Sequence, residues 1–120
     1  MIEERRKYIR IPVGLEFLYK VKGDKTDVKQ KSITKNISPG GIQGFVNAII
    51  KNGDVLEMDI KIPTSKYPVS ALGKVVWTAE QYGDKIDAGI KFEEIEPEAK
   101  NRFLEYICEL MYSELERLRI

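Results

Sequence analysis

The chain has 120 residues, of which 42% are hydrophobic, and its 20 Lys and Arg nearly balance its 19 Asp and Glu. This size allows one domain with a modest core, and the balance of charge argues against a protein that coats nucleic acid. Histidine is absent and Cys108 is the single cysteine, so zinc sites, internal disulfides and histidine-dependent catalysis are not expected. No apolar run approaches the length of a membrane span. We therefore expect a soluble cytoplasmic protein that is not an enzyme, needs no metal or cofactor, and does not insert into a membrane.

A cluster of cations comes first along the chain. Four of them lie within six residues: Arg5, Arg6, Lys7 and Arg10. Pro12 follows at once and biases Ile11 toward an extended conformation, so the cluster belongs to no helix. A guanidinium presents a planar fork of donors, which suits phosphate oxygens and the O6/N7 edge of guanine. We interpret residues 1–12 as a flexible basic arm that binds an anionic ligand, with a solvated basic tail as the alternative.

The middle of the chain reads as short strands joined mostly by tight turns. Six segments fit: residues 13–21, 28–37, 42–46, 55–62, 67–78 and 86–92. In the second segment, strict alternation places Thr34 and Asn36 on one face and Lys35 and Ile37 on the other. Glycines in the middle of three segments, at 44, 73 and 89, favour the bends that closure of a barrel requires. The pattern predicts a mainly β fold, a six-stranded antiparallel β-barrel over residues 13–96.

Residues 97–120 are predicted to form a long C-terminal α-helix of the same domain. Pro97 suits the first helical position, and the charge of Glu98 suits a helix N-terminus. One apolar stripe is expected to cover an open end of the barrel: Phe103, Ile107 and Leu110. A second stripe has heptad-like spacing and could pair with a partner helix in a homodimer: Leu104, Cys108, Met111, Leu115 and Leu118. We expect Cys108 to be a small buried apolar residue.

A turn with two glycines joins the second and third predicted strands, in the run Asn36-Ile37-Ser38-Pro39-Gly40-Gly41. Asn36 and Ser38 are short polar residues that can both donate and accept hydrogen bonds. Gly41 has no side chain, so a flat ring could lie close to the backbone there. Taken alone, this run is first of all a turn between two strands.

Together, the arm and the turn resemble the PilZ domain family. That family has Arg-x-x-x-Arg ahead of the first strand and [Asp/Asn]-x-Ser-x-x-Gly between the second and third strands. Here the first motif is Arg6 to Arg10 and the second is Asn36 to Gly41. The resemblance continues through three later segments and the C-terminal helix, over about residues 4–112: Gly53-Asp54-Val55-Leu56, Gly73-Lys74-Val75-Val76-Trp77 and Ala88-Gly89-Ile90-Lys91-Phe92.

The resemblance implies a bacterial receptor for the second messenger cyclic di-GMP. Its arm would close over a nucleotide bound on the barrel and create a surface for an unidentified effector protein. The implied ligand-binding residues are Arg5, Arg6, Arg10, Asn36, Ser38, Gly40 and Gly41. Asn36 stands where many relatives carry Asp, and an amide oxygen accepts guanine N–H groups without charge assistance, so binding is expected to survive but to be weaker.

Two other interpretations remain at this point. The first is a degenerate PilZ-like interaction module that binds no nucleotide and dimerises through its C-terminal helix. The second is an enzyme or an RNA-binding barrel. The sequence disfavours it, because we find neither a convincing acid–base pair nor aromatic residues alternating with basic ones on one sheet face.

Overall fold

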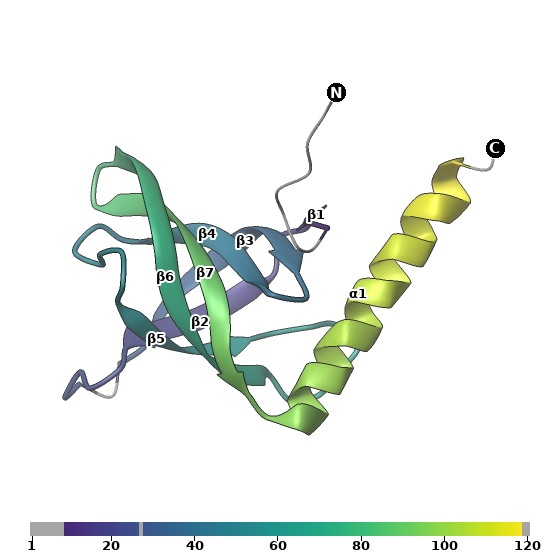
Figure 1. Ribbon diagram of the computed structural model, residues 1–120, viewed down its shortest axis with the longest axis horizontal. Coiled ribbons are helices and arrows are strands. Elements are labelled where there is room, and N and C mark those ends of the chain that lie inside the picture. Colours follow the sequence, from purple (N-terminus) through teal and green to yellow (C-terminus); the bar gives the residue numbers. More distant parts are fainter. Residues whose placement is uncertain (1–8, 27, 119–120) are drawn as a thin grey trace.

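The computed structural model describes residues 9–26 and 28–118, and this part of the chain forms seven strands and one helix (Figure 1). The strands are β1 (Ile11–Pro12), β2 (Glu16–Val21), β3 (Gln30–Ser38), β4 (Gly41–Asn47), β5 (Val55–Ile60), β6 (Val69–Tyr82) and β7 (Lys85–Ile95), and the helix is α1 (Pro97–Leu118). Each of the six predicted strands and the predicted helix is present, and β1 is an additional short strand. No helix in the described ranges is long and apolar enough to cross a membrane.

The sheet closes on itself. Its strands follow the order β3-β2-β5-β6-β7-β4, and β4 pairs again with β3, every pairing being antiparallel. The predicted six-stranded barrel is therefore confirmed. β2 pairs with the first half of β3, and β1 pairs with the last residues of β3. The seventh strand thus extends the barrel wall at the point where the chain enters it.

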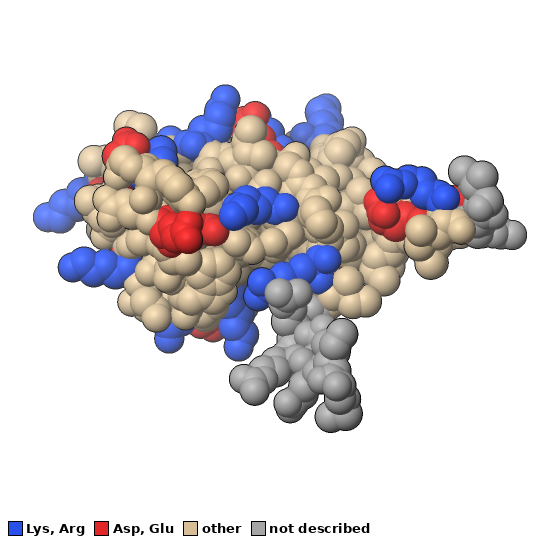
Figure 2. Space-filling view, turned by 90° about the horizontal axis from the view of Figure 1, so that it is seen from above, with Lys and Arg blue, Asp and Glu red and all other residues tan. Residues whose placement is uncertain are grey.

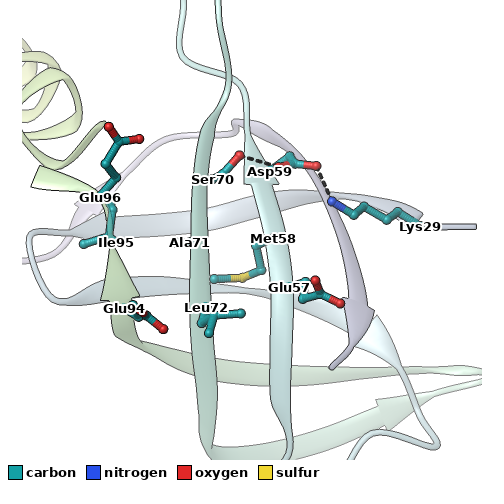
Figure 3. Close-up of a pocket in the computed structure, with 10 residues that line it drawn as sticks. All are labelled: Lys29, Glu57, Met58, Asp59, Ser70, Ala71, Leu72, Glu94, Ile95 and Glu96. Atoms are coloured by element: carbon teal, nitrogen blue, oxygen red, sulfur yellow. Dashed lines mark hydrogen bonds and ion pairs between the residues drawn. The ribbon is translucent and has the colours of Figure 1, made fainter. Parts of the chain in front are cut away.

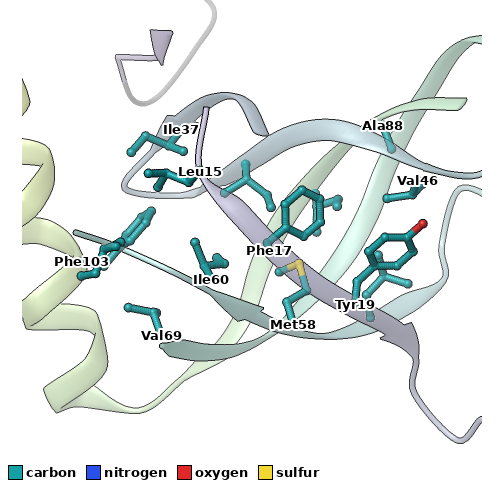
Figure 4. Packing of buried hydrophobic residues seen from close by; sticks show 14 of the residues in the cluster. Leu15, Phe17, Tyr19, Ile37, Val46, Met58, Ile60, Val69, Ala88 and Phe103 are labelled. Carbon is teal, nitrogen blue, oxygen red and sulfur yellow. The ribbon is translucent and has the colours of Figure 1, made fainter. Parts of the chain in front are cut away.

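The barrel interior is filled by the inward faces of the strands (Figure 4). Phe17 and Tyr19 of β2 are 0% and 1% exposed, and Leu56, Met58 and Ile60 of β5 lie against them. Burial of each such side chain stabilises the fold by about 1.5–3 kcal/mol. Buried apolar residues at every second position made these two strands readable from the sequence, although β2 also carries an apolar residue, Leu18, on its outer face.

β3 departs from the predicted alternation. Its register with β4 shifts between Thr34, opposite Gly44, and Asn36, opposite Gln43. Such a β-bulge inserts one extra residue, here Lys35, and reverses the faces that follow. Thr34 and Ile37 are consequently both buried, whereas Lys35 is exposed and Asn36 half-buried. The predicted facing of β3 is wrong, and the bulge instead places Lys35 and Asn36 together on the outside of the barrel.

The first half of α1 closes one end of the barrel. Phe103 is 1% exposed, and its ring meets that of Phe92 edge-on with 5.4 Å between centroids. Ile107 is buried and Leu110 half-buried, so the predicted covering stripe is confirmed. Arg102 joins the helix to the loop before β6, because its Nη1 donates to Ser65 Oγ at 2.6 Å.

The second half of α1 extends away from the barrel (Figure 1). Met111, Leu115 and Leu118 of the second stripe are 38%, 60% and 79% exposed. Cys108 is also exposed, so the prediction of a buried cysteine is wrong. Cys108 follows the buried pair Tyr106 and Ile107 directly, so it lies on the side of the helix that does not face the barrel.

Candidate ligand-binding site

The pairing of β1 with β3 brings the start of the described chain to the predicted turn motif. Ile11 lies opposite Ile37 and Pro12 opposite Asn36. Continuing this antiparallel register places exposed Arg10 opposite Ser38. Two residues assigned to the arm, Ile11 and Pro12, are therefore part of the sheet. The other two predicted arm ligands, Arg5 and Arg6, lie outside the described residues.

A buried threonine holds the segment between β1 and β2 in place. Thr34 Oγ1 accepts the backbone N–H of Leu15 at 2.8 Å and donates to the carbonyl of Val13 at 2.6 Å. The bulge in β3 turns Thr34 inward, so its hydroxyl needs these partners to offset the cost of burial. The same contacts fix the direction in which the chain arrives from Arg10.

The turn of the β3–β4 hairpin is organised by Ser38. Its Oγ accepts the Gly40 N–H at 3.2 Å and lies 3.4 Å from the Gly41 carbonyl, to which it donates. The Gly40 carbonyl accepts the Phe92 N–H of β7 at 2.9 Å. A hydroxyl has two acceptor sites, so Ser38 keeps one for an external donor. Both backbone groups of Gly40 are already used, which leaves this residue only a close-approach role toward a ligand.

Glycine at position 41 has a packing reason. A Cβ there would lie 2.0 Å from the carbonyl oxygen of Ile90 on β7, much closer than any real contact. Gly41 is buried and pairs with Lys91, so the hairpin reaches β7 only with glycine at this position. Its predicted role in admitting a guanine ring stays a prediction.

Asn36 belongs to a hydrogen-bond relay that crosses three strands, which we call the amide relay: Asn36, Gln43 and Asp87. Asn36 Nδ2 donates to Gln43 Oε1 at 2.6 Å. Gln43 Nε2 donates to both oxygens of Asp87, at 3.2 and 3.1 Å. Lys35 Nζ donates to Asp87 Oδ2 at 3.0 Å and lies 5.2 Å from the Phe45 ring centroid. The side chain of Asp87 is 13% exposed and that of Lys35 46% exposed, so only the carboxylate end of this pair is shielded from water.

Sequence reasoning did not find Gln43, Asp87 or Lys35. Gln43 lies two residues after the motif glycine, on an outward position of β4, and Asp87 lies opposite Phe45 on β7. The one available signal was that Gln43 and Asp87 are polar residues at regular strand positions, which many surface residues share. Only the register between β3, β4 and β7 shows that they meet Asn36.

The charged side chains are mixed over the surface. Figure 2 shows Lys and Arg side chains spread over one face of the molecule, with Asp and Glu side chains among them. This distribution agrees with a net charge of +1. Among the described residues, no group of three or more His, Cys, Asp or Glu could hold a metal ion.

A shallow pocket of about 310 Å³ lies elsewhere on the barrel, over β5, β6 and the end of β7 (Figure 3). Leu72 contributes an apolar part of its lining, and its rim carries one lysine and four carboxylates: Lys29, Glu57, Asp59, Glu94 and Glu96. None of the motif residues lines it. A rim with this excess of negative charge repels phosphate, so the pocket does not suit an anionic ligand.

In this pocket Asp59 is held by two neighbours. Lys29 Nζ donates to its Oδ2 at 2.5 Å, and Ser70 Oγ donates to its Oδ1 at 2.7 Å. Partial burial raises the pKa of Asp59, but the hydrogen bonds from Lys29 and Ser70 together outweigh it and hold the pKa below its usual value. Both oxygens of this carboxylate are therefore used within the barrel wall.

Comparisons with known proteins agree with the fold. The structure resembles the inhibitor of motility MotI/DgrA of Bacillus subtilis, with a TM-score of 0.74 at 19% identity over 98% of this chain and 55% of that one. It resembles the PilZ domain of Escherichia coli YcgR with c-di-GMP, with a TM-score of 0.71 at 12% identity over 98% of this chain and all of that one. At these identities the likeness shows the fold alone.

A third similar structure is the MrkH–c-di-GMP complex of K. pneumonia, with a TM-score of 0.73 at 13% identity over 98% of this chain and 55% of that one. The chain thus spans about half the length of MotI and MrkH. No curated protein matches the sequence. A family model described as the PilZ domain matches residues 4–109. Since this match covers most of the chain and the closed barrel agrees with solved PilZ structures, the chain belongs to the PilZ domain family.

Proposed function

We propose that this domain is a non-enzymatic receptor for cyclic di-GMP, which it binds on the outer side of the β3–β4 hairpin under the N-terminal arm. The observation that carries the proposal is the register of β1 with β3, which makes Arg10 leave the barrel at Ser38. Arg10, the last residue of the first motif, thereby lies beside Ser38 of the second, which supports a common ligand for the two motifs. The YcgR domain and MrkH were solved with c-di-GMP, which supports the same ligand here.

The arm supplies the positive charge that the ligand needs. Cyclic di-GMP carries two phosphates and two guanines, and Arg6 and Arg10 would bind phosphate oxygens and guanine edges, with Arg5 adding a phosphate or stacking contact. Fixing the backbone of the arm costs about 1–2 kcal/mol per residue, and each charge-assisted hydrogen bond contributes about 1.5–3 kcal/mol. Ordering several residues therefore requires several such hydrogen bonds. One arginine alone would not supply enough of them to close the arm.

The hairpin supplies the groups that read the base. Asn36 Oδ1 receives no hydrogen bond from residues 9–26 or 28–118, and Ser38 Oγ keeps one acceptor site. Both can accept N–H groups of guanine. The closed arm would cover this face with new charge and so create the surface that an effector protein recognises.

Calorimetric titration with cyclic di-GMP tests the proposal. We expect saturable binding by the folded protein, and loss of binding in the double variant Arg6→Ala/Arg10→Ala with little change in ligand-free melting temperature, because the arm adds little to the core. Arg117→Ala removes one positive charge from an exposed helix position and should leave the affinity unchanged. Absence of heat at high micromolar ligand, with a cooperative melting transition, would refute a cyclic di-GMP receptor.

The exposed half of α1 favours a second role, pairing with another copy of the chain. Met111, Tyr112, Leu115 and Leu118 are exposed over two turns, and such a stripe is more stable when covered. We propose a homodimer through these residues. Sedimentation equilibrium of the parent and of Leu115→Glu should give a dimer and a monomer, respectively, and equal masses would rule out this dimer.

A further inference from the structure

An asparagine at a ligand-binding edge can act in two opposite ways. Its side-chain amide has an oxygen that only accepts and a nitrogen that only donates, and the two ends have nearly the same shape. Which end faces the ligand therefore decides whether Asn36 attracts or repels a given base edge. A carboxylate at the same position would have no such ambiguity, because both of its ends accept.

Asp87, at the opposite end of the amide relay from Asn36, decides which end of the Asn36 amide faces the ligand. Asp87 accepts hydrogen bonds and donates none, so Gln43 must turn its Nε2 toward this carboxylate, as the contacts at 3.2 and 3.1 Å show. The Oε1 of Gln43 is then the end that faces Asn36. Only the Nδ2 of Asn36 can meet an acceptor at 2.6 Å, so its Oδ1 is the end left for a ligand.

We propose that Asp87 and Gln43 are positioning residues that fix the side-chain amide of Asn36 as a hydrogen-bond acceptor and thereby make the site select guanine. The inference rests on the proposed function and deepens it. Guanine presents adjacent N1–H and N2–H donors on one edge, whereas adenine places an acceptor, N1, at the corresponding position. An outward Oδ1 fits the first base, and an outward Nδ2 would fit the second.

Lys35 orients the side-chain amide that replaces the carboxylate of Asp87. In Asp87→Asn, Lys35 donates to the oxygen of the new amide, because it lies 3.0 Å from the position of Oδ2. The new Nδ2 then takes the position of Oδ1, 3.2 Å from Gln43 Nε2, and two donors face each other, while the amide oxygen at the position of Oδ2 still accepts from Gln43 Nε2 at 3.1 Å. The preference of Gln43 for one orientation is therefore weakened, and Asn36 presents its Nδ2 to the ligand in a larger share of the molecules.

A double exchange tests this polarity directly. Asp87→Asn in the parent should weaken binding of cyclic di-GMP by up to about 100-fold, the upper range of a mismatched hydrogen bond at a base edge. Asn36→Asp alone sets two acceptors against one glutamine, Asp87 on one side and the new carboxylate on the other. Adding Asp87→Asn to that background lets the glutamine turn over and satisfy both neighbours, so the same substitution should then strengthen binding.

The change of sign is the readout that a merely structural role does not produce. A structural loss at Asp87 would weaken binding in both backgrounds, and that result, or an unchanged affinity in the parent, overturns the proposal. Cyclic di-AMP serves as a second probe. Asp87→Asn should lower the ratio of the affinity for cyclic di-GMP to the affinity for cyclic di-AMP, and an unchanged ratio counts against the relay. Asp59→Asn is the matched control, since Asp59 is also paired with a lysine but lies on β5, which pairs with none of β3, β4 and β7.

Two further measurements keep the outcomes separable. If Asp87→Asn does not fold, Gln43→Met removes the middle amide, and it should weaken binding in the parent but not in the Asn36→Asp background. Equal weakening in both would refute the relay. In the ligand-free protein, the side-chain amide NMR signals of Asn36 should shift in Asp87→Asn but not in Asp59→Asn. A parent that binds no cyclic di-GMP overturns the proposed function and the ligand role with it, whereas a binding parent without the change of sign overturns the relay alone.

Discussion

Two clusters, each built on a lysine–aspartate pair, lie on the outside of the same barrel. They differ in whether the last polar atom of the cluster has a hydrogen-bond partner among the described residues. On β5 and β6, Asp59 uses one oxygen for Lys29 and the other for Ser70, so its capacity is filled inside the cluster. On β3, β4 and β7, Asp87 binds Lys35 and Gln43, and the relay continues to Asn36.

The difference lies at the last atom of each cluster. Among the described residues, Asn36 Oδ1 has no hydrogen-bond donor, and it lies on the strand that β1 joins. The cluster around Asp59 ends on a serine hydroxyl in a pocket with an acidic rim. The same kind of ion pair therefore ties strands together in one place and, in the other, supports an acceptor that no donor of residues 9–26 or 28–118 occupies. The following changes test whether the two clusters separate in this way.

The largest effect is expected from breaking the hairpin that carries the free acceptor. Gly41→Ala places a Cβ 2.0 Å from the Ile90 carbonyl oxygen, so β4 must move away from β7. We expect a loss of about 3 kcal/mol or more in the free energy of unfolding, measured by urea denaturation. Gly44→Ala is the milder comparison, since a Cβ added there would lie 3.1 Å from its nearest atom, which belongs to the Phe17 ring. Equal losses in the two variants would contradict the packing reason given for Gly41.

Removal of the free acceptor should affect binding without affecting stability. Asn36→Ala deletes the proposed acceptor of the guanine N–H groups, and we expect cyclic di-GMP to bind about tenfold more weakly. The side chain is only half-buried, so the melting temperature should hardly change. Calorimetric titration and thermal melting of the same samples check both statements. An unchanged affinity would mean that Asn36 does not touch the ligand.

The Asp59 cluster should show the reverse behaviour, with the smallest effect. Asp59→Asn is expected to cost about 1 kcal/mol of unfolding free energy at pH 7 and to leave the affinity for cyclic di-GMP unchanged. Folding lowers the pKa of Asp59, so its contribution is present above the pKa of the unfolded chain and disappears as the pH falls through the lower folded value. Urea denaturation of both proteins between pH 3 and pH 7 should therefore show the difference shrinking in acid. A difference that grows in acid contradicts the cause assigned to the shift.

Much of the barrel could be predicted from the sequence. In β5, for example, the buried residues Leu56, Met58 and Ile60 alternate with polar ones. The helix could be predicted for the same kind of reason, with Pro97 at its start and a stripe around Phe103. The bulge at Lys35 could not, because an extra residue in one strand appears only when the partner strand is aligned with it.

The two motifs could be named in advance, but the register that sets Arg10 opposite Ser38 could not be derived from spacing alone. The amide relay was out of reach for a similar reason. Gln43 and Asp87 are 44 residues apart, and nothing in a single sequence says that β4 and β7 are neighbours in this register. The exposure of Cys108 depends on which side of the helix packs against the barrel, and two apolar stripes in the sequence do not decide that.

The central claim is that cyclic di-GMP binds at the β3–β4 hairpin and not in the acidic pocket. Titration of the nitrogen-15-labelled protein with cyclic di-GMP, followed residue by residue by NMR, tests it most directly. We predict that the largest shifts fall on Arg10, Asn36, Ser38 and Gly40, while Asp59 and Ser70 hardly move. Shifts concentrated on Asp59, Ser70 and their neighbours, or no shifts at all, would contradict the claim.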